Sequence, residues 1–357
     1  MKALILTGKF GMGHWSAAQA LAQQLRDEGH QAAVIDLFAY ALPELAPSMY
    51  RGFQVLVRYM GGVYNLYHRA TRNAENEGPL ISLLWSRLGG LMGAVRPNVI
   101  LSTHPVCSCA AARYKRDAGM PVPLITCITD VTSHSEWLHP ETDCYLVPSP
   151  SVREALAEKG VARTRIVVSG IPVRAGFAAA RRQDGPRQLL IMGGGLGLMP
   201  RGDAFYEALN SLEGVRTTIL TGRNEKLYRR LAGRYAQIEA VPFTDRVPEY
   251  MGRAHLMLSK PGGITVFEAI AARLPMLAWE PFLEQERENA RFLVQGGMAR
   301  VAPKEESACL SAIRETIYDR ELLAEMGRAM NRLAGALDGE GVCAAVRKAV
   351  GGGRVCA

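Results

Sequence analysis

Apolar and β-branched residues recur along this chain in short runs, and stretches with helical periodicity separate these runs. We expect strands at 2–8, 32–37, 98–103, 123–129, 143–147 and 165–169, and a second group at 188–193, 216–221, 237–242, 255–259, 275–279 and 299–302. Apolar residues three and four positions apart predict helices at 14–28, 204–212, 264–273, 286–296 and 307–317. Strands that alternate with helices are typical of parallel sheets. The pattern therefore predicts an α/β protein with two doubly wound domains.

The segment 170–187 separates the two groups of strands. It combines glycine and proline with four arginines, a composition that favours a linker. We therefore expect an N-terminal domain at 1–170 and a C-terminal domain at 171–335. The remaining residues, 336–357, predict a helix and tail whose path can lead back to the N-terminal domain, and the final letters "GGGRVCA" predict a mobile end.

Composition places the chain among ordinary globular proteins. Of its 357 residues, 48% are hydrophobic and 21% are charged. Charged residues such as Asp36 and Arg51 interrupt the most apolar region, so we expect no membrane-spanning helix. The start "MKALILTG" is too short for a signal peptide and favours a strand. Seven cysteines without metal-ligand spacing favour reduced thiols, and hence a cytoplasmic location.

The net charge of +8 is concentrated in the second half of the chain. The first 150 residues hold 12 Lys and Arg against 11 Asp and Glu, so seven of the eight excess charges lie beyond them. Such a balance suits an anionic partner, either a nucleic acid or a membrane. Because the sequence has no extended block of basic residues, we expect no nucleic-acid partner.

About sixty residues separate the second and third expected strands, more than a helix and its loops require. Between 49 and 92, aromatic and aliphatic residues, including Tyr59 and Trp85, alternate with arginines. One interpretation is that they form the buried faces of two ordinary helices. The other is an amphipathic surface in the membrane interface, where aromatic rings lie at headgroup depth and arginine meets anionic lipid.

The first strand leads into "TGKFGMGHW", a glycine-rich turn before a helix, where an anion or substrate can approach the backbone. A phosphate-binding loop is excluded because His14 and Trp15 occupy the places of its Lys and Ser/Thr. A dinucleotide site built from Gly11, Gly13 and Asp36 stays open. Another alternative is that His14 removes a proton from a hydroxyl. In the remaining one His14 only caps the helix.

Three segments of the second half follow strands and precede helices. The first, "MGGGLGLMP", offers backbone amides from Gly194 and Gly195. In the second, "LSKPGGITVFEA", amides at a helix start can hold a diphosphate and Glu268 can accept ribose hydroxyls. The third, "EPFLEQERENA", contains Gln285, Glu286 and other polar residues suited to a polyhydroxylated ligand, although they also suit a surface helix.

Seven motifs in order along the chain resemble the monogalactosyldiacylglycerol synthase and processive diacylglycerol glucosyltransferase family, which is related to the lipid II N-acetylglucosaminyltransferase. They are "GMGHWSAAQAL", "STHPV", "ITDVTSHSEWLHPETDCYLVPS", "GIPV", "MGGGLGL", "SKPGGITVFEA" and "FLEQERENA". The resemblance implies the GT-B architecture, with two Rossmann-like domains facing a central cleft. It places the donor in the C-terminal domain and the acceptor in the N-terminal one, and it implies inversion without a bound metal.

The resemblance also implies roles for individual residues. His14 resembles the acceptor-side base, with Asp130 as its partner or rival, and Phe243 resembles the uracil-side contact, although Pro242 stands where we expect glycine in relatives. The full set of expected donor contacts is Gly194, Gly195, Phe243, Gly262, Gly263, Thr265, Glu268, Gln285, Glu286 and Asn289. The expected acceptor and lipid contacts are Gly13, Tyr59, Trp85 and Trp137.

The function implied is transfer of glucose or galactose from a UDP-sugar to the hydroxyl of diacylglycerol by a peripheral enzyme at the inner face of the cell membrane. The UDP-sugar is a substrate, so no cofactor and no metal are expected, and an anionic membrane surface is the expected partner. Three alternatives stay open. They are an NAD(P)-dependent dehydrogenase using the Gly11, Gly13 and Asp36 site, a lipid transferase that uses N-acetylglucosamine, and a membrane-surface binder without enzymatic activity.

Overall fold

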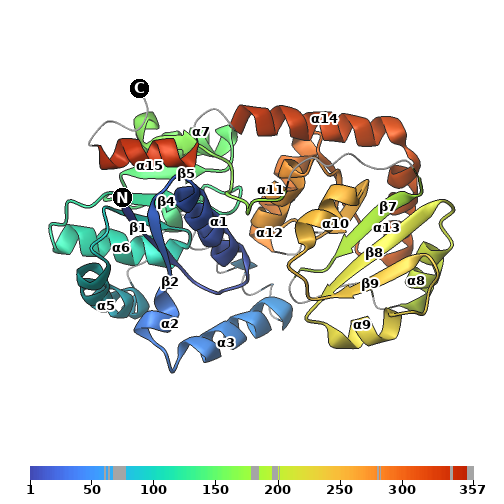
Figure 1. Cartoon of the computed structure of the whole chain (residues 1–357), viewed down its shortest axis with the longest axis horizontal. Helices are drawn as coiled ribbons and strands as arrows, with labels where there is room; N and C mark the ends of the chain where they lie inside the picture. Colours follow the sequence, from blue (N-terminus) through green and yellow to red (C-terminus); the bar gives the residue numbers. More distant parts are fainter. Residues whose placement is uncertain are drawn as a thin grey trace. The chain divides into compact units, whose positions relative to one another are not determined.

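Each half of the chain carries a parallel sheet of six strands in the computed structural model (Figure 1). The structure describes residues 1–59, 62, 65–66, 78–177, 185–194, 200, 202–279, 281, 283–337 and 341–351. The first sheet has the order β2-β1-β3-β4-β5-β6 and the second the order β12-β11-β10-β7-β8-β9. All neighbouring strands in both sheets are parallel. This confirms the prediction of two doubly wound α/β domains.

All twelve predicted strands are present, with ends displaced by no more than two residues. In the first half they are β1 (Lys2–Thr7), β2 (Gln31–Asp36), β3 (Val99–Ser102), β4 (Leu124–Cys127), β5 (Cys144–Val147) and β6 (Ile166–Val168). In the second half they are β7 (Arg187–Met192), β8 (Val215–Gly222), β9 (Ile238–Pro242), β10 (Leu256–Ser259), β11 (Met276–Trp279) and β12 (Ala299–Ala302).

The five predicted helices are also present, together with others that the sequence analysis did not place. In the first half the helices are α1 (Gly13–Asp27), α2 (Leu37–Ala41), α3 (Ala46–Tyr59), α5 (Pro79–Val95), α6 (Pro105–Asp117) and α7 (Pro150–Glu158), with short 3-10 helices at Ser135–Trp137 and Arg163–Arg165. In the second half they are α8 (Asp203–Asn210), α9 (Glu225–Leu231), α10 (Val247–Arg253), α11 (Gly263–Ala271), α12 (Glu284–Gln295), α13 (Glu306–Tyr318), α14 (Arg320–Leu337) and α15 (Val342–Val350).

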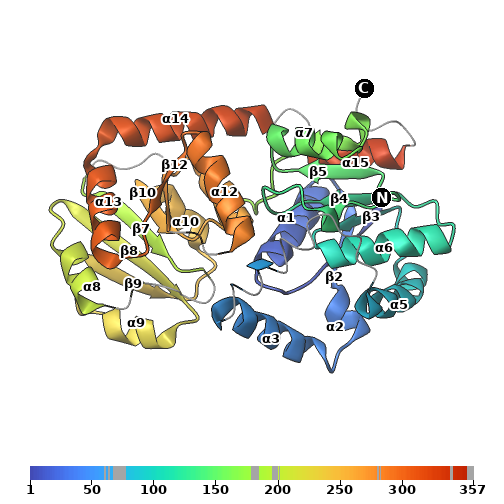
Figure 2. The same ribbon diagram turned by 180° about the vertical axis from the view of Figure 1, so that it is seen from behind.

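Helices cover both faces of the first sheet. Alternate residues of β1 point to opposite faces, so each face of the sheet receives part of this strand. Ala3 and Ile5 pack with α1 and α15 on one face, whereas Leu4 and Leu6 pack with α2, α5 and α6 on the other. Figure 2 shows α5 and α6 side by side on that second face. In the second sheet, Leu189 and Ile191 of β7 pack with α8, α9 and α13.

The chain divides into two compact units whose limits differ slightly from the predicted domains. One unit comprises residues 1–174, 283–285 and 337–357, and the other comprises 175–282 and 286–336. Helix α15 belongs to the first unit, since Val342 and Val346 are buried with Leu21 and Leu25 of α1 (Figure 1). The tail that we expect to be mobile, 352–357, lies outside the described residues. Within the described ranges, no helix is long and apolar enough to cross a membrane.

Because all strands of a sheet run the same way, their carboxyl ends lie along one edge, which is where parallel sheets bind ligands. In the first sheet β1, β3 and β4 are neighbours, so the segments after Thr7, Ser102 and Cys127 leave the sheet side by side. In the second sheet the same holds for the segments after β11, β10, β7, β8 and β9. The topology therefore brings predicted site residues from distant parts of the sequence to one edge in each unit.

Candidate active site

The glycine-rich turn after β1 has a shape that depends on two of its glycines. A Cβ atom on Gly8 would lie 2.7 Å from the ring of Phe38, so no larger residue fits without displacing that ring. Gly11 has φ of +76°, a conformation that favours glycine. The turn ends at Met12, and His14 is the second residue of α1. The predicted base therefore stands at the carboxyl edge of the first sheet.

Neighbouring strands fix the position of His14. Its Nδ1 atom lies 2.7 Å from Oγ1 of Thr129, two residues after β4. The hydroxyl of Thr103, next to β3, donates to the carbonyl of His14 at 2.9 Å. Both threonines are buried, so these contacts form in a dry layer beneath the imidazole. The ring and the backbone of His14 are thus each held by a separate strand.

Burial lowers the pKa of His14 to about 4, although a hydrogen bond with the Thr103 backbone acts in the opposite direction. The imidazole is therefore neutral near pH 7. A neutral imidazole can accept a proton from a hydroxyl, whereas an imidazolium cannot. This protonation state fits the predicted role of a base.

A second buried histidine, to which the sequence analysis assigned no role, lies against the first. The ring centroids of His14 and His104 are 4.7 Å apart, with the planes inclined by 68°. His104 caps α6, because its Nδ1 accepts a hydrogen bond from the amide of Val106 at 3.3 Å. Burial lowers the pKa of His104 well below its usual value, and electrostatic repulsion from His14, when that ring is protonated, adds to the effect. Its position before Pro105 in "STHPV" was the available signal, since proline often follows a helix cap.

Asp130 follows Thr129 directly and is partly exposed. Burial raises the pKa of Glu136 to about 7, and the negative charge of Asp130 adds to the effect. Asp130 and Glu136 therefore form an acidic pair near the same edge of the sheet. Glu136 was not among the predicted site residues, and nothing in its sequence position distinguishes it from a surface carboxylate.

The predicted lipid contacts need correction at Trp137. Its side chain is only 2% exposed, so the expectation that it faces lipid is wrong. It lies in the 3-10 helix after β4, with its ring centroid 6.1 Å from that of His14. Its large apolar surface is buried beneath the site, where packing gains more than interfacial exposure would.

The other predicted acceptor and lipid contacts differ in what the structure shows. Gly13 is exposed at the first position of α1. Trp85 is half-buried on α5, beneath the guanidinium of Arg113 at 5.2 Å, so little of its ring is open to lipid. Tyr59 ends α3, but its side chain lies outside the description.

In the second unit, the first backbone amides of α11 lie before the first hydrogen bond of the helix. Gly262 is its N-cap and provides no side-chain hydrogen bond. The first intrahelical bond runs from the amide of Val266 to Gly262, so the amides of 263–265, which include Gly263 and Thr265, precede the helical ladder. Glu268, one turn later, is 8% exposed. This helix start is the arrangement that binds a phosphate group.

The loop before α11 and the helix α12 are joined by two polar contacts. Nζ of Lys260 lies 2.7 Å from Oε1 of Glu286. Asn289 is fully buried, and its amide donates to the carbonyl of Pro261 at 3.0 Å. Asn289 is thus engaged in holding the loop, and its contact with a donor stays a prediction. Gln285 stands half-buried at the start of the same helix.

Farther along this edge, Phe243 follows β9 and is 54% exposed. The guanidinium of Arg223, which follows β8, lies 5.6 Å from the Phe243 ring centroid. Gly194 follows β7 with φ of +67°, and Gly195 lies outside the described residues. Since β10, β7, β8 and β9 are consecutive in the sheet, these residues share an edge with the start of α11.

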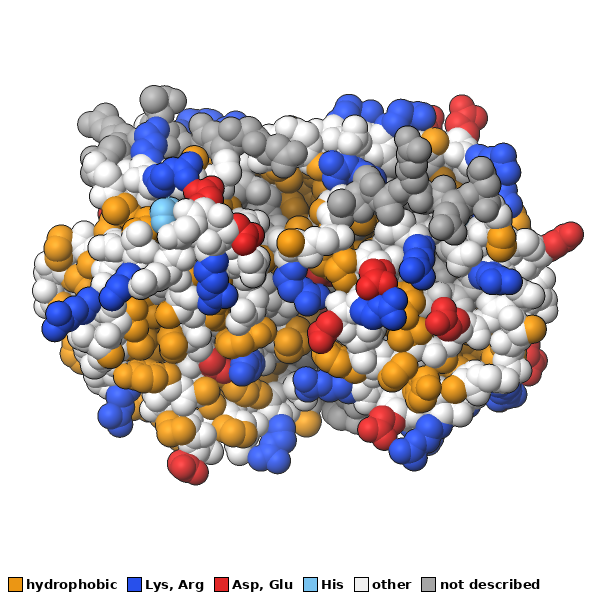
Figure 3. Space-filling view, in the orientation of Figure 1, with side chains coloured by type: hydrophobic (Ala, Val, Ile, Leu, Met, Phe, Trp, Pro, Cys, Tyr) orange, Lys and Arg blue, Asp and Glu red, His pale blue; other side chains and the backbone are white. Residues whose placement is uncertain are grey.

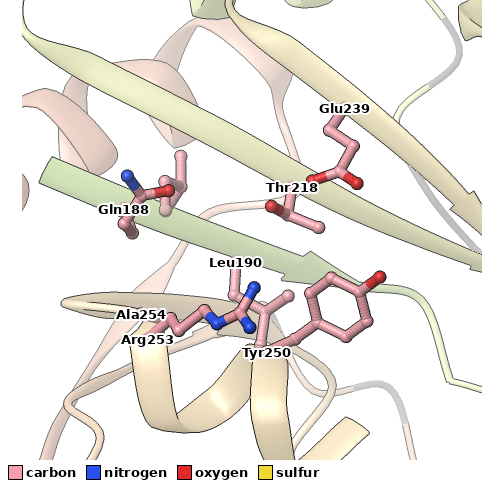
Figure 4. Close-up of a pocket in the computed structure, with 8 residues that line it drawn as sticks. Gln188, Leu190, Thr218, Glu239, Tyr250, Arg253 and Ala254 are labelled. Atoms are coloured by element: carbon pink, nitrogen blue, oxygen red, sulfur yellow. The ribbon is translucent and has the colours of Figure 1, made fainter. Parts of the chain in front are cut away.

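A small cavity in this unit is separate from that edge. It has a volume of about 70 Å³ and lies between α10 and the strands β7, β8 and β9 (Figure 4). Its walls include Gln188, Leu190, Thr218, Glu239 and Tyr250. A more open groove of about 580 Å³ is lined by charged residues around α10. None of the predicted donor contacts lines either space, and the smaller is far below the size of a nucleotide pocket.

Asp36, the acidic residue of the dinucleotide alternative, already has hydrogen-bond partners. Oδ1 of Asp36 accepts hydrogen bonds from the amide of Ala39 at 3.1 Å and from the hydroxyl of Tyr50 at 2.5 Å. Asp36 thus caps α2 and anchors α3. Asp36 is also only 9% exposed, so a ribose would have to displace its neighbours to reach the carboxylate, which disfavours a nicotinamide site here.

Comparison with known proteins agrees with this geometry. The monogalactosyldiacylglycerol (MGDG) synthase family model matches residues 14–173, and the glycosyltransferase family 28 C-terminal domain matches residues 190–337. The processive diacylglycerol beta-glucosyltransferase of Bacillus cereus (strain AH187) is 26% identical over 356 residues, covering 93% of this chain and 89% of that protein.

Two solved structures show how widely the fold is used. MurG from Acinetobacter baumannii has a TM-score of 0.62 at 18% identity, over 94% of this chain and 98% of that one. A UDP-GlcNAc 2-epimerase from Neisseria meningitidis bound to UDP-GlcNAc has a TM-score of 0.55 at 16% identity, over 94% and 99%. Fold likeness at this level leaves the reaction open, so the family matches and the site must decide it.

The two sheets, the helix start after β10 and the two matches that span most of the chain define a glycosyltransferase of the GT-B fold. More particularly, residues 14–173 match the monogalactosyldiacylglycerol synthase family, and the chain is similar over 93% of its length to a processive diacylglycerol beta-glucosyltransferase.

The lowered pKa of His14 predicts a pH dependence of stability. Between pH 6.5 and about 4 the unfolded chain binds a proton at His14 that the folded protein does not, so stability falls as pH decreases through this window. A shift of this size corresponds to roughly 3 kcal/mol at full burial, and the partial exposure of the ring reduces it. Thermal unfolding of wild type and His14→Asn should therefore show a shallower acid-side fall in the variant. Equal slopes would show that His14 titrates normally.

Proposed function

We propose that the protein transfers glucose or galactose from a UDP-sugar to the hydroxyl of diacylglycerol, with inversion at the anomeric carbon and without a metal ion. The observation that carries the proposal is the neutral imidazole of His14, held at the carboxyl edge of the first sheet by Thr129. A base in this state is what a neutral alcohol needs in order to become a nucleophile. The Bacillus cereus relative bears the name of such a transferase.

The reaction requires one bond to form as another breaks. The lipid hydroxyl oxygen bonds to the anomeric carbon while its proton passes to His14. Because Nδ1 faces Thr129, we assign the proton to Nε2. The bond between the anomeric carbon and the diphosphate oxygen breaks, and its electron pair leaves with UDP. The carbon carries positive character at the transition state, as in glycoside hydrolysis.

Negative charge that develops on the diphosphate has candidate partners in the second unit. The amides at the start of α11 can donate to phosphate oxygens, and the ammonium of Lys260 stands in the preceding loop. Glu286 holds that ammonium, and Asn289 holds the loop backbone. These contacts support a metal-independent reaction, because the protein itself supplies the positive partners. The same segment includes Glu268, which we assign to the ribose.

For the lipid substrate we propose peripheral binding at the inner face of the cell membrane. Apolar side chains on or beside α2, α3 and α5 are exposed, namely Tyr40, Leu45, Val55 and Leu83. Figure 3 shows hydrophobic side chains gathered over these helices, with Lys and Arg around them. The buried faces of the same helices pack on the first sheet, as one sequence interpretation of this region predicts, and the exposed faces are those that we assign to the membrane. An anionic surface suits the net charge of +8.

The transferase proposal is tested by the products that form. Purified protein is incubated with diacylglycerol vesicles and UDP-glucose, UDP-galactose or UDP-N-acetylglucosamine, with and without EDTA, and the lipids are identified by mass. We expect hexosyl diacylglycerol, formed at the same rate in EDTA. UDP should raise the melting temperature, NAD should not, and Glu268→Ala should reduce the UDP effect because a charged hydrogen bond is worth about 1.5–3 kcal/mol. No lipid product with any donor, or stabilisation by NAD alone, would refute the proposal.

Replacement of the proposed base tests whether catalysis and UDP binding depend on different units. His14→Ala should lower kcat by about 10²–10⁴-fold, the usual contribution of a general base, and leave the dissociation constant of UDP near wild type. Steady-state kinetics and calorimetry measure the two quantities. Asp130→Asn is the comparison. If Asp130→Asn abolishes turnover while His14→Ala retains it, Asp130 is the base and the assignment is reversed.

Membrane binding is tested with vesicles and a matched pair of variants. Val55→Asp places a charge on the exposed apolar face of α3 and should reduce co-sedimentation with anionic vesicles several-fold. Val301→Asp changes a similarly exposed valine on β12 and should leave sedimentation unchanged. Binding should also weaken as salt rises, because headgroup attraction is worth about 1 kcal/mol per basic residue. Equal binding by both variants would place the membrane surface elsewhere.

A further inference from the structure

The contacts of His104 go beyond those of a helix cap. Its ring is 7% exposed and lies among aromatic rings. The centroid of Phe10 lies 5.4 Å away and that of Phe38 lies 5.2 Å away, while His14 is nearer still at 4.7 Å. Phe10 belongs to the glycine-rich turn, so the ring of His104 touches both the turn and the histidine that the turn presents.

The protonation of His104 is determined by its cap. Because Nδ1 accepts the hydrogen bond from the amide of Val106, a neutral ring must carry its proton on Nε2. Another titratable group, Cys107, stands three residues after His104 on α6, and Asp36 lies close enough to act on it. Burial raises the pKa of Cys107, so its thiol stays uncharged. Because burial holds its pKa well below the usual value, His104 stays neutral near pH 7.

These contacts lead to a role in catalysis that does not involve the substrate. We propose that His104 is a positioning residue for His14: its ring excludes water from one side of the imidazole and fixes the direction in which that imidazole points. Thr129 holds one nitrogen of His14, and the ring of His104 limits how far the imidazole can tilt about that contact. The proposal rests on the proposed function only in that His14 is the base.

Two substitutions separate the ring contact from the cap. His104→Asn keeps a side-chain acceptor at the N-cap but removes the ring, whereas His104→Phe keeps a ring of similar size but removes the acceptor. If the ring positions His14, His104→Asn should lower kcat at least about tenfold, part of the usual contribution of a base, with the donor KM unchanged. His104→Phe should retain most of kcat with a lower melting temperature. If His104 acts only as a helix cap, His104→Phe should lower kcat and His104→Asn should preserve it.

A second measurement does not depend on activity. In protein labelled at histidine, NMR titration follows the pKa of His14. We expect a value of about 4 in wild type and His104→Phe, and a value displaced toward 6.5 in His104→Asn, because water reaches the imidazole. His134→Asn is the matched control. His134 is 1% exposed and also caps its helix through Nδ1, at 3.2 Å from the amide of Glu136, and its substitution should leave the titration of His14 unchanged.

The outcomes distinguish this inference from the proposed function. An unchanged His14 titration in His104→Asn, together with kcat within twofold of wild type, overturns the positioning role. The positioning role is also overturned if kcat falls in His104→Phe and is preserved in His104→Asn. If His14→Ala keeps full activity, the base assignment fails instead, whereas a displaced titration in His104→Asn still establishes that His104 keeps the neighbouring imidazole dry.

Discussion

The parallel direction of the strands is the constraint on which both candidate sites depend. It places the segment after β1, which ends at Thr7, beside those after β3 and β4, which end at Ser102 and Cys127. Each segment brings different residues to the candidate site of the first unit. β1 leads to His14, β3 to the threonine and histidine beneath it, and β4 to Thr129, which faces its ring. A single antiparallel strand among the three would send one contribution to the opposite edge.

The second unit uses the same topology with a different kind of support. Its loops offer backbone amides, which are strong donors only if the loop keeps its shape. The buried side-chain amide of Asn289 on α12 holds the loop by donating a hydrogen bond to its carbonyl. The ion pair of Lys260 with Glu286 joins the same two segments. The residues that hold the loop are as necessary to the site as those that would touch a ligand, although they are hidden from it.

The fold could be predicted from sequence in detail, because burial on both faces produces the apolar runs that mark parallel strands. All twelve strands follow from this signal. The motifs also indicated where the sites lie, but not which polar side chains face outward. Trp137 and Asn289 stand in motifs that resemble binding segments, yet both are buried, and one-dimensional spacing does not distinguish a supporting residue from a contacting one. The importance of His104 and Lys260 depends on neighbours distant in sequence, so no local pattern revealed it.

The last described helix has a consequence for how the protein is made. Helix α15 completes the core of the first unit, but the chain reaches it only after the whole second unit has been synthesised. Before residues 342–346 leave the ribosome, the apolar faces of α1 and β5 that they cover remain exposed to water. The N-terminal unit therefore cannot finish folding before the second unit has been synthesised, contrary to the usual order in multidomain chains. Folding of the half that carries the proposed base waits for the synthesis of α15.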